Sequence, residues 1–255
     1  MCLILVAWRA HPDYPLVVAA NRDEFFARPA ARAAWWTSAP SVFAGRDLEA
    51  GGTWLGLTRG GRFAGLTNFR DPGRTRNGTP SRGALVADFL TGGERTADAL
   101  ARLQREGPRY NAFNIFVSDG DSLGIYESES GAAHILEPGL HALSNHLLDT
   151  PWPKVTAGKS RLARALRALP DDTPLRELLR DDRPAADAML PRTGVSLAWE
   201  RMLSSAFIRA PGYGTRCSTV ITRDRHGWTH VTESSWNEVG TETDRIVETF
   251  QVDRR

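Results

Sequence analysis

The chain has 255 residues, of which 41% are hydrophobic and 24% are charged, and its formal net charge is +2. This composition is typical of a globular protein and excludes disordered and collagen-like chains. Basic residues are spread along the sequence without the basic stripe that nucleic-acid binding requires, so we expect no nucleic-acid partner. No run approaches the roughly 18 apolar residues of a membrane span. We therefore expect a single domain over residues 1–255, and the sequence leaves its oligomeric state open.

The cysteine content and the N-terminus indicate where the protein resides. Cys2 and Cys217 are the two cysteines, too few for a disulfide framework, which favours a reducing compartment. The apolar start has no basic region before it and is interrupted by Arg9, a pattern not typical of a secretory signal. Together these features predict a cytoplasmic protein.

The predicted elements come in blocks along the chain. Apolar runs and turn residues predict strands over 3–8, 16–20, 53–57, 62–66, 114–118, 123–127, 133–137, 141–144, 217–222, 228–232 and 245–252. Helical spacing predicts helices over 81–90 and 94–105, and a helical block over 154–203 that four prolines divide into short pieces. The order of strands, helices, strands, helices and strands predicts α+β layering rather than an alternating parallel sheet.

Cys2 is the first candidate for chemistry. Initiator methionine is usually removed before a small residue, and its removal here leaves a free α-amine and a thiol on Cys2. Such an amine, with an ordinary pKa of about 8, can act as the base for its own side chain. A cysteine at this position is equally typical of a small buried residue at the start of a strand.

Polar residues at four other predicted strand ends or loops are further candidates. Arg22 and Asp23 directly follow a strand, where an arginine favours a thiolate and a carboxylate can hold an amine. Asn68 and Asn145 also end strands, and a side-chain amide there can donate to an oxyanion. Arg216 follows a glycine-containing loop. Each residue taken alone is as typical of a turn or a strand end.

Other possible motifs are absent. Residues 158–160 read Gly-Lys-Ser, but Pro153 stands where a P-loop needs its first glycine. His226 and His230 fall in a predicted hairpin, and we find no spacing of metal ligands, so we expect neither a metal nor a required cofactor.

Several segments together point to a known family. They are Met1-Cys2 and residues 21–25, 45–47, 51–56, 67–70, 143–145, 151–154 and 214–219. In this order they resemble the NRDE family, also called the Transport and Golgi organization 2 family. That family is similar to the N-terminal-nucleophile (Ntn) hydrolases of the choloylglycine hydrolase and penicillin V acylase group. The resemblance implies a four-layer αββα sandwich with an N-terminal cysteine nucleophile.

The resemblance also implies roles for individual residues. Arg22 and Asp23 match the arginine and aspartate that follow the second strand in that group, with Glu24 as the alternative to Asp23. Asn68 and Asn145 match its two asparagines, and Arg216 matches its late arginine.

Two functions follow from these expectations. The first is an amidohydrolase or acyltransferase in which Cys2 attacks a small acyl amide or thioester. The alternative, which the family's link to lipid and haem handling raises, is a non-catalytic carrier of haem or an acyl lipid. In a haem carrier, His146 or a cysteine is the expected axial ligand.

Overall fold

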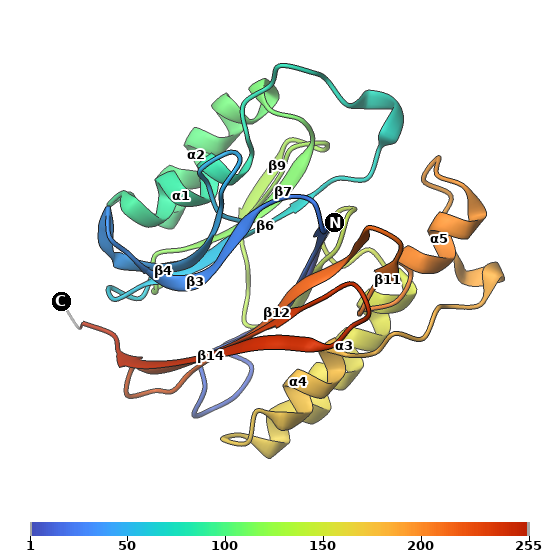
Figure 1. Cartoon of the computed structure of the whole chain (residues 1–255). Helices are drawn as coiled ribbons and strands as arrows, with labels where there is room; N and C mark the ends of the chain where they lie inside the picture. Colours follow the sequence, from blue (N-terminus) through green and yellow to red (C-terminus); the bar gives the residue numbers. More distant parts are fainter. Residues whose placement is uncertain (1, 254–255) are drawn as a thin grey trace.

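The computed structural model describes residues 2–253. Two antiparallel sheets of seven strands each stack face to face, and helices cover the outer face of each sheet (Figure 1). This arrangement confirms the predicted α+β class and the predicted four-layer αββα sandwich. Within residues 2–253, no helix is both long and apolar enough to cross a membrane.

The first sheet contains both ends of the described chain. Its strands are, in spatial order, β10 (Gly139–Leu143), β1 (Cys2–Trp8), β2 (Leu16–Phe25), β12 (Tyr213–Arg223), β13 (Trp228–Trp236) and β14 (Glu242–Gln251), with the short β11 (Arg209–Ala210) paired to β12. Strand β1 is therefore an inner strand, between β10 and β2, and it is buried on both faces of the sheet, which explains its uninterrupted apolar sequence.

The second sheet is a meander in which each strand pairs with the next along the chain. Its strands are β3 (Ala30–Trp36), β4 (Ala39–Asp47), β5 (Leu55–Thr58), β6 (Phe63–Asn68), β7 (Phe113–Ser118), β8 (Leu123–Glu127) and β9 (Ala132–Ile135). The sequence did not predict β3 and β4, because β3 is rich in alanine, a residue depleted in strands, and exposes most of its side chains.

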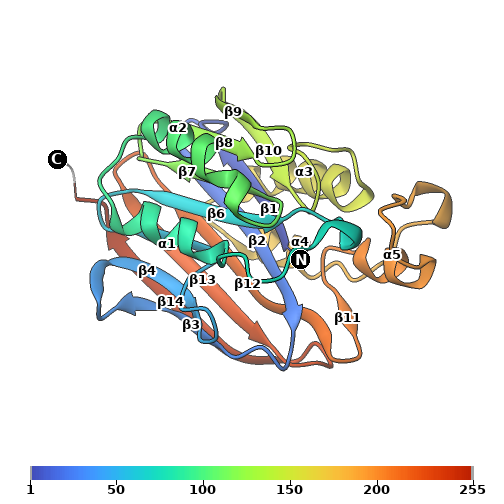
Figure 2. The ribbon, with the colours of Figure 1, turned by 90° about the horizontal axis from the view of Figure 1, so that it is seen from above.

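Helices pack on the outer faces of both sheets. On the second sheet lie α1 (Gly83–Thr91) and α2 (Thr96–Glu106); on the first lie α3 (Pro153–Ala165) and α4 (Thr173–Leu179). A fifth helix, α5 (Leu197–Leu203), lies at one end of the sandwich (Figure 2). Short 3-10 turns occupy Pro72–Arg74, Gly107–Arg109, Leu166–Ala168 and Asp187–Met189.

The side chains of β1 alternate between two hydrophobic cores. Ile4 and Val6 face the core between the two sheets, whereas Leu3 and Leu5 face the core beneath α3 and α4. Because side chains alternate along a strand, Cys2 shares the face of Ile4 and Val6. The fold thus directs the Cys2 side chain into the space between the sheets.

Candidate functional site

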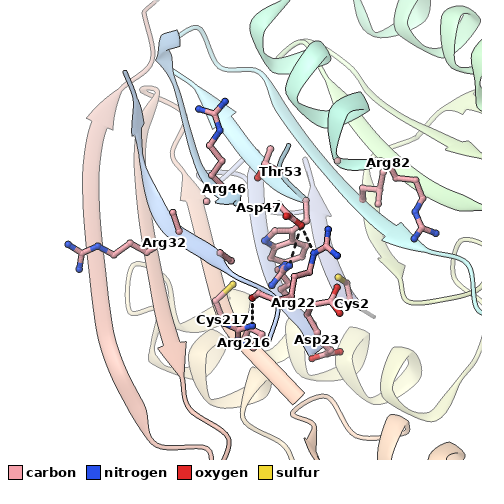
Figure 3. A pocket seen from close by; sticks show the side chains of 18 of the residues that line it. Cys2, Arg22, Asp23, Arg32, Arg46, Asp47, Thr53, Arg82, Arg216 and Cys217 are labelled. Carbon is pink, nitrogen blue, oxygen red and sulfur yellow. Dashed lines mark hydrogen bonds and ion pairs between the residues drawn. The ribbon is translucent and has the colours of Figure 1, made fainter. Parts of the chain in front are cut away.

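Three adjacent strands bring two cysteines and an arginine into one row. Cys2 on β1 is opposite Arg22 on β2, and Arg22 is opposite Cys217 on β12. Residues directly opposite on paired antiparallel strands project from the same face of the sheet. Figure 3 shows the Arg22 side chain lying between the two sulfur atoms. The chain therefore gathers at one place residues that are far apart in sequence.

This row forms part of the wall of a cavity of about 670 Å³ between the two sheets. Of the predicted site residues, the cavity is lined by Cys2, Arg22, Asp23, Asn68 and Arg216, whereas Asn145 is absent from its wall. Many of the lining residues are arginines or acidic residues: Arg22, Arg28, Arg32, Arg46, Arg82 and Arg216, and Asp23, Glu24, Asp47, Glu233 and Asp244. Figure 3 labels Arg22, Arg46 and Asp47 among them. A cavity of this kind suits a polar or charged ligand.

Opposing influences act on the Cys2 thiol. Burial raises its pKa above the ordinary value, and the Asp23 carboxylate adds to the rise. Arg22 and a hydrogen bond from the Asp23 backbone lower the same pKa. Arg22 therefore favours the thiolate that an otherwise buried site disfavours.

Arg22 is only partly satisfied by its neighbours. It is 9% exposed, and its Nη2 atom lies 3.9 Å from the Asp47 carboxylate. Among the described residues its buried Nη1 atom has no hydrogen-bond partner. A buried N–H group without an acceptor destabilises the folded protein, unless a ligand or a thiolate accepts a hydrogen bond from it.

Asp23 lies next to Arg22 along β2, so its side chain projects away from that of Arg22. It is 1% exposed, and its Oδ1 atom accepts a 2.7 Å hydrogen bond from the Thr215 hydroxyl. Glu24, the alternative raised by the sequence, is half-buried and accepts instead from the backbone N–H of Phe25. Asp23 is thus the buried carboxylate beside the end of β1.

The two asparagines occupy different positions in the site. Asn68 ends β6 and lines the cavity, as an oxyanion donor must. Asn145 is fully buried and donates its side-chain amide to the Asn68 backbone carbonyl at 2.8 Å. Asn145 therefore links the end of β10 in the first sheet to the end of β6 in the second, and its side-chain amide already has the Asn68 carbonyl as an acceptor.

Arg216 is the extra residue of a β-bulge, since the register of β12 against β2 shifts between Thr215 and Cys217. Its Nη1 atom donates to the backbone carbonyls of Phe25 and Arg28 at 2.8 and 3.0 Å. Bulges re-aim side chains, and this one places Cys217 rather than Arg216 opposite Arg22. Arg216 lines the cavity while it holds the turn that follows β2.

Cys217 is a second thiol on the wall of the cavity. Burial raises its pKa well above the ordinary value, and the neighbouring Glu233 carboxylate raises it further, so the thiol stays protonated. Two strand spacings put its Cα roughly 10 Å from that of Cys2. A disulfide needs Cα atoms closer than about 7 Å, so these cysteines cannot pair without backbone movement.

Sequence reasoning missed two cations near Cys2. Arg82, at the start of α1, lines the cavity, and the Cys2 side chain is among the groups that raise its pKa against the lowering caused by burial. Lys154, in the first turn of α3, is 4% exposed and interacts electrostatically with Asp23 and Cys2. A signal for Lys154 was present, because Lys154 and Lys159 are the only lysines in an arginine-rich chain.

His146, the residue expected to bind haem in a carrier, does not line the cavity of Cys2. Its Nδ1 atom is 2.9 Å from the Thr150 hydroxyl, and its ring lies near those of Phe69 and Trp152. The predicted removal of Met1 lies outside the described residues.

The chain is similar to two solved hydrolase structures. They are the C2A mutant of the conjugated bile acid hydrolase from Clostridium perfringens (11% identity, 99% of this chain and 97% of that one, TM-score 0.44) and the N-acylethanolamine-hydrolyzing acid amidase ortholog of Caenorhabditis elegans (12% identity, 86% and 92%, TM-score 0.47). Similarity at this level is too weak to transfer an activity.

Sequence relatives are much closer. The Transport and Golgi organization protein 2 homologs of Bos taurus and Homo sapiens are 37% and 36% identical; the alignments cover 96% and 92% of this chain, and 96% and 93% of the relatives. The protein of the same name in Drosophila melanogaster is 29% identical over 96% of this chain and 98% of its own. The family model for Transport and Golgi organisation 2 matches residues 1–238. The chain therefore belongs to the Transport and Golgi organisation 2 family.

Proposed function

We propose that this protein is an N-terminal-cysteine amidohydrolase or acyltransferase that acts on a small acyl amide or thioester. The observation that carries the proposal is the place of Cys2. It begins a central strand, faces a cavity of about 670 Å³ and lies directly opposite Arg22. In this proposal Met1 is removed, so that the α-amine and the thiol of Cys2 belong to the same residue.

The reaction begins when the Cys2 sulfur attacks the acyl carbonyl carbon and the α-amine takes the thiol proton. The tetrahedral intermediate then collapses, the bond from carbon to the leaving nitrogen or sulfur breaks, and the α-amine returns the proton to the leaving group. Water, or a second acceptor in a transferase, then gives a proton to the α-amine and attacks the thioester carbon on Cys2. The carbon–sulfur bond breaks, the acyl group leaves as the acid or as the new acyl product, and the α-amine returns the proton to the Cys2 sulfur. The thiol and the amine end in their starting states.

Neighbouring residues have separate parts in this mechanism. Arg22 favours the thiolate, and Asn68 donates to the oxyanion from the opposite sheet. Asp23 orients the α-amine by a charge-assisted hydrogen bond, and Arg216 adds positive charge to the cavity wall.

The test is a hydrolysis screen of acyl amides and acyl thioesters with the untagged protein. We expect Cys2→Ala to abolish turnover, while Cys217→Ala, a matched thiol on the same wall, retains most of it. Circular dichroism of both variants checks the fold. A Cys2→Ala protein that turns over at the wild-type rate contradicts the proposal, and ligand binding without turnover in any variant favours a carrier.

A further inference from the structure

The N-terminal end of α1 forms part of the wall of the cavity that Cys2 faces. Ser81, Arg82 and Gly83 line this cavity, whereas the later residues of the helix do not. The first turn contains no acidic residue, and Arg82, at the N-cap position, makes no capping hydrogen bond with its side chain. Because the N-terminal end of a helix carries a partial positive charge and unpaired N–H groups, this end of α1 favours an anion in the cavity.

Close packing of the loop after β4 holds this end of α1 in place. The Thr53 N–H donates to the Gly83 carbonyl at 3.2 Å. A Cβ atom on Gly52 would lie 2.5 Å from the Gly83 carbonyl carbon, so the approach of the two backbones requires glycine. Since Thr53 also lines the cavity, the contact fixes the helix end in the cavity wall.

Arg82 adds a full positive charge at the same place. It is half-buried, and among the described residues its guanidinium makes one hydrogen bond, from Nη1 to the Ala112 backbone carbonyl at 3.0 Å, and no ion pair. Arg82 and Asn111 also line a second cavity of about 320 Å³, so Arg82 lies where the two cavities meet. Its charge and its remaining N–H groups are therefore left for a ligand.

The acidic residues of the cavity wall have partners of their own. These are Arg28 for Asp47, Arg32 for Asp244, the Thr215 hydroxyl for Asp23, the Phe25 N–H for Glu24, and the Ala33 N–H and Thr219 hydroxyl for Glu233. None of these carboxylates forms an ion pair with Arg82 in the described part of the chain. The positive charge of Arg82 thus has no counter-charge in direct contact.

A buried N–H group on the opposite side of the cavity is a second, independent sign of a ligand. Arg22 is 9% exposed, and within residues 2–253 its Nη1 atom has no hydrogen-bond partner. Figure 3 shows Arg82 on the α1 side of the pocket and Arg22 on the β2 side. An acceptor on the ligand would satisfy this donor, which otherwise destabilises the folded protein.

We propose that the substrate carries an anionic group, a carboxylate or a phosphate, and that Arg82 and the N-terminal end of α1 bind it. This inference rests on the proposed function, since it names the class of acyl donor that reaches Cys2. Arg82 is then a specificity-determining residue, because a neutral substrate of the same shape leaves its charge without a partner.

The test compares probes that differ in one charge. N-octanoylglycine and N-octanoylglycinamide place the charge, or its neutral replacement, on the amine side of the amide bond, and N-butylglutaramic acid and N-butylglutaramide place it on the acyl side. N-octanoylphosphoethanolamine and N-octanoylethanolamine test a phosphate in place of the carboxylate. Calorimetric titration of the Cys2→Ala protein measures affinity without turnover, and kcat/KM of the wild type measures selectivity.

We expect at least one charged probe to bind about 10-fold more tightly than its neutral partner, or better, as is typical of hydrogen bonds to a charged group. The pair that responds most shows which side of the amide bond carries the charge and whether it is a carboxylate or a phosphate. Arg82→Gln, made in the Cys2→Ala protein, should remove most of this preference. Arg32→Gln is the matched control and should keep it, because the Arg32 charge is already paired with Asp244.

A second pair of variants tests the helix end itself. Ser81→Asp places a carboxylate there and should also remove the preference, whereas the neutral Ser81→Asn should keep it. Charged probes that bind no better than their neutral partners, or that do not bind, overturn the inference, as does a preference that survives Arg82→Gln. If circular dichroism shows that Arg82→Gln does not fold, Ser81→Asp decides in the same way.

Binding and turnover can fail separately. If the wild type hydrolyses none of the probes while the Cys2→Ala protein prefers the charged ones, the proposed reaction fails and the anion site stands. If the wild type hydrolyses charged and neutral probes with equal kcat/KM, and the Cys2→Ala protein binds them equally, the reaction stands and the anion site is overturned.

Discussion

Arg22 lies directly opposite Cys2 across the β1–β2 pair, and its buried Nη1 atom has no hydrogen-bond partner among residues 2–253. The same guanidinium lowers the pKa of the Cys2 thiol against the effect of burial. The Arg22 guanidinium thus lowers the pKa of the thiol that we propose as nucleophile. Its Nη1 atom can also donate a hydrogen bond to a substrate.

Arg22→Gln should make Cys2 less reactive. Without the positive charge the pKa of the thiol rises, so less thiolate is present at pH 7.5, and alkylation by iodoacetamide should slow by about 3- to 10-fold, because one pKa unit is a factor of ten. The measurement is the alkylation rate of Cys2 by mass spectrometry between pH 6 and pH 10. Arg46→Gln, on the same cavity wall, is the control and should leave the rate nearly unchanged. Equal rates for Arg22→Gln and wild type would show that Arg22 does not tune the thiol.

Asn68→Ala should reduce catalysis with little change in stability. Asn68 lines the cavity from the second sheet, and losing one oxyanion donor typically lowers kcat by on the order of 100-fold. Its half-buried side chain contributes little to the core, so the free energy of unfolding should change by less than about 1 kcal/mol. Steady-state kinetics and urea unfolding measure the two effects. An undiminished kcat would remove Asn68 from the mechanism.

Asn145→Ala should affect both stability and catalysis. The substitution leaves the Asn68 carbonyl without the 2.8 Å hydrogen bond that joins the two sheets, and an unsatisfied buried group costs about 1–3 kcal/mol. Since Asn68 then loses its support, kcat should fall as well. The same two measurements apply. A variant as stable as the wild type would contradict the bridging role of this side chain.

Asp119 should make a stabilising contribution that acid removes. Burial pushes its pKa up, but hydrogen bonds from the backbone N–H groups of Thr96, Ser122 and Asp121 lower it to about 2. A carboxyl with a lowered pKa stabilises the fold above its ordinary value of 3.8 and loses this effect as pH falls towards 2.

For Asp119→Asn we therefore expect a loss of about 1 kcal/mol at pH 7, a figure reduced for solvent screening of a partly exposed group. The difference from wild type should shrink to less than half at pH 2.5, where the carboxyl is protonated in the unfolded chain and partly protonated in the folded one. Urea unfolding at both values measures it, with the exposed Asp88→Asn as control. A difference that is independent of pH would show that the charge of Asp119 is not what stabilises the turn.

Local sequence patterns were enough to predict much of the fold. The apolar run of β1 and the Asp-Gly-Asp turn between β7 and β8 carry their own signals, and Gly120 in that turn has a φ of 102°, which glycine adopts readily. The edge strand β3 has no such signal, since its alanines pack against neighbours only after the sheet has formed. Long-range pairing, rather than local preference, makes it a strand.

The candidate site, like the fold, combines features that the sequence predicts with features that it does not. The meeting of Cys2, Arg22 and Asp23 could be predicted, because Cys2 precedes one apolar run, the two others follow a second, and the resemblance to a known family placed them together. The structure differs in one respect, because β2 continues to Phe25, so Arg22 and Asp23 lie within this strand rather than after it. The hydrogen bond of Asn145 to Asn68 and the burial of Lys154 could not be predicted. The direction of the Asn145 amide depends on the meeting of two sheets, and the burial of Lys154 depends on how closely α3 packs on β1. Such features exist only in the assembled structure.

The most direct test of the central claim is the intact mass of the untagged protein after brief mixing with an excess of an acyl thioester, followed by peptide mapping. We expect a chain that lacks Met1 and carries one acyl group on Cys2, and we expect no acylation of Cys2→Ala. A chain that lacks Met1 but stays unmodified, or that carries the acyl group on Cys217, would contradict Cys2 as the nucleophile.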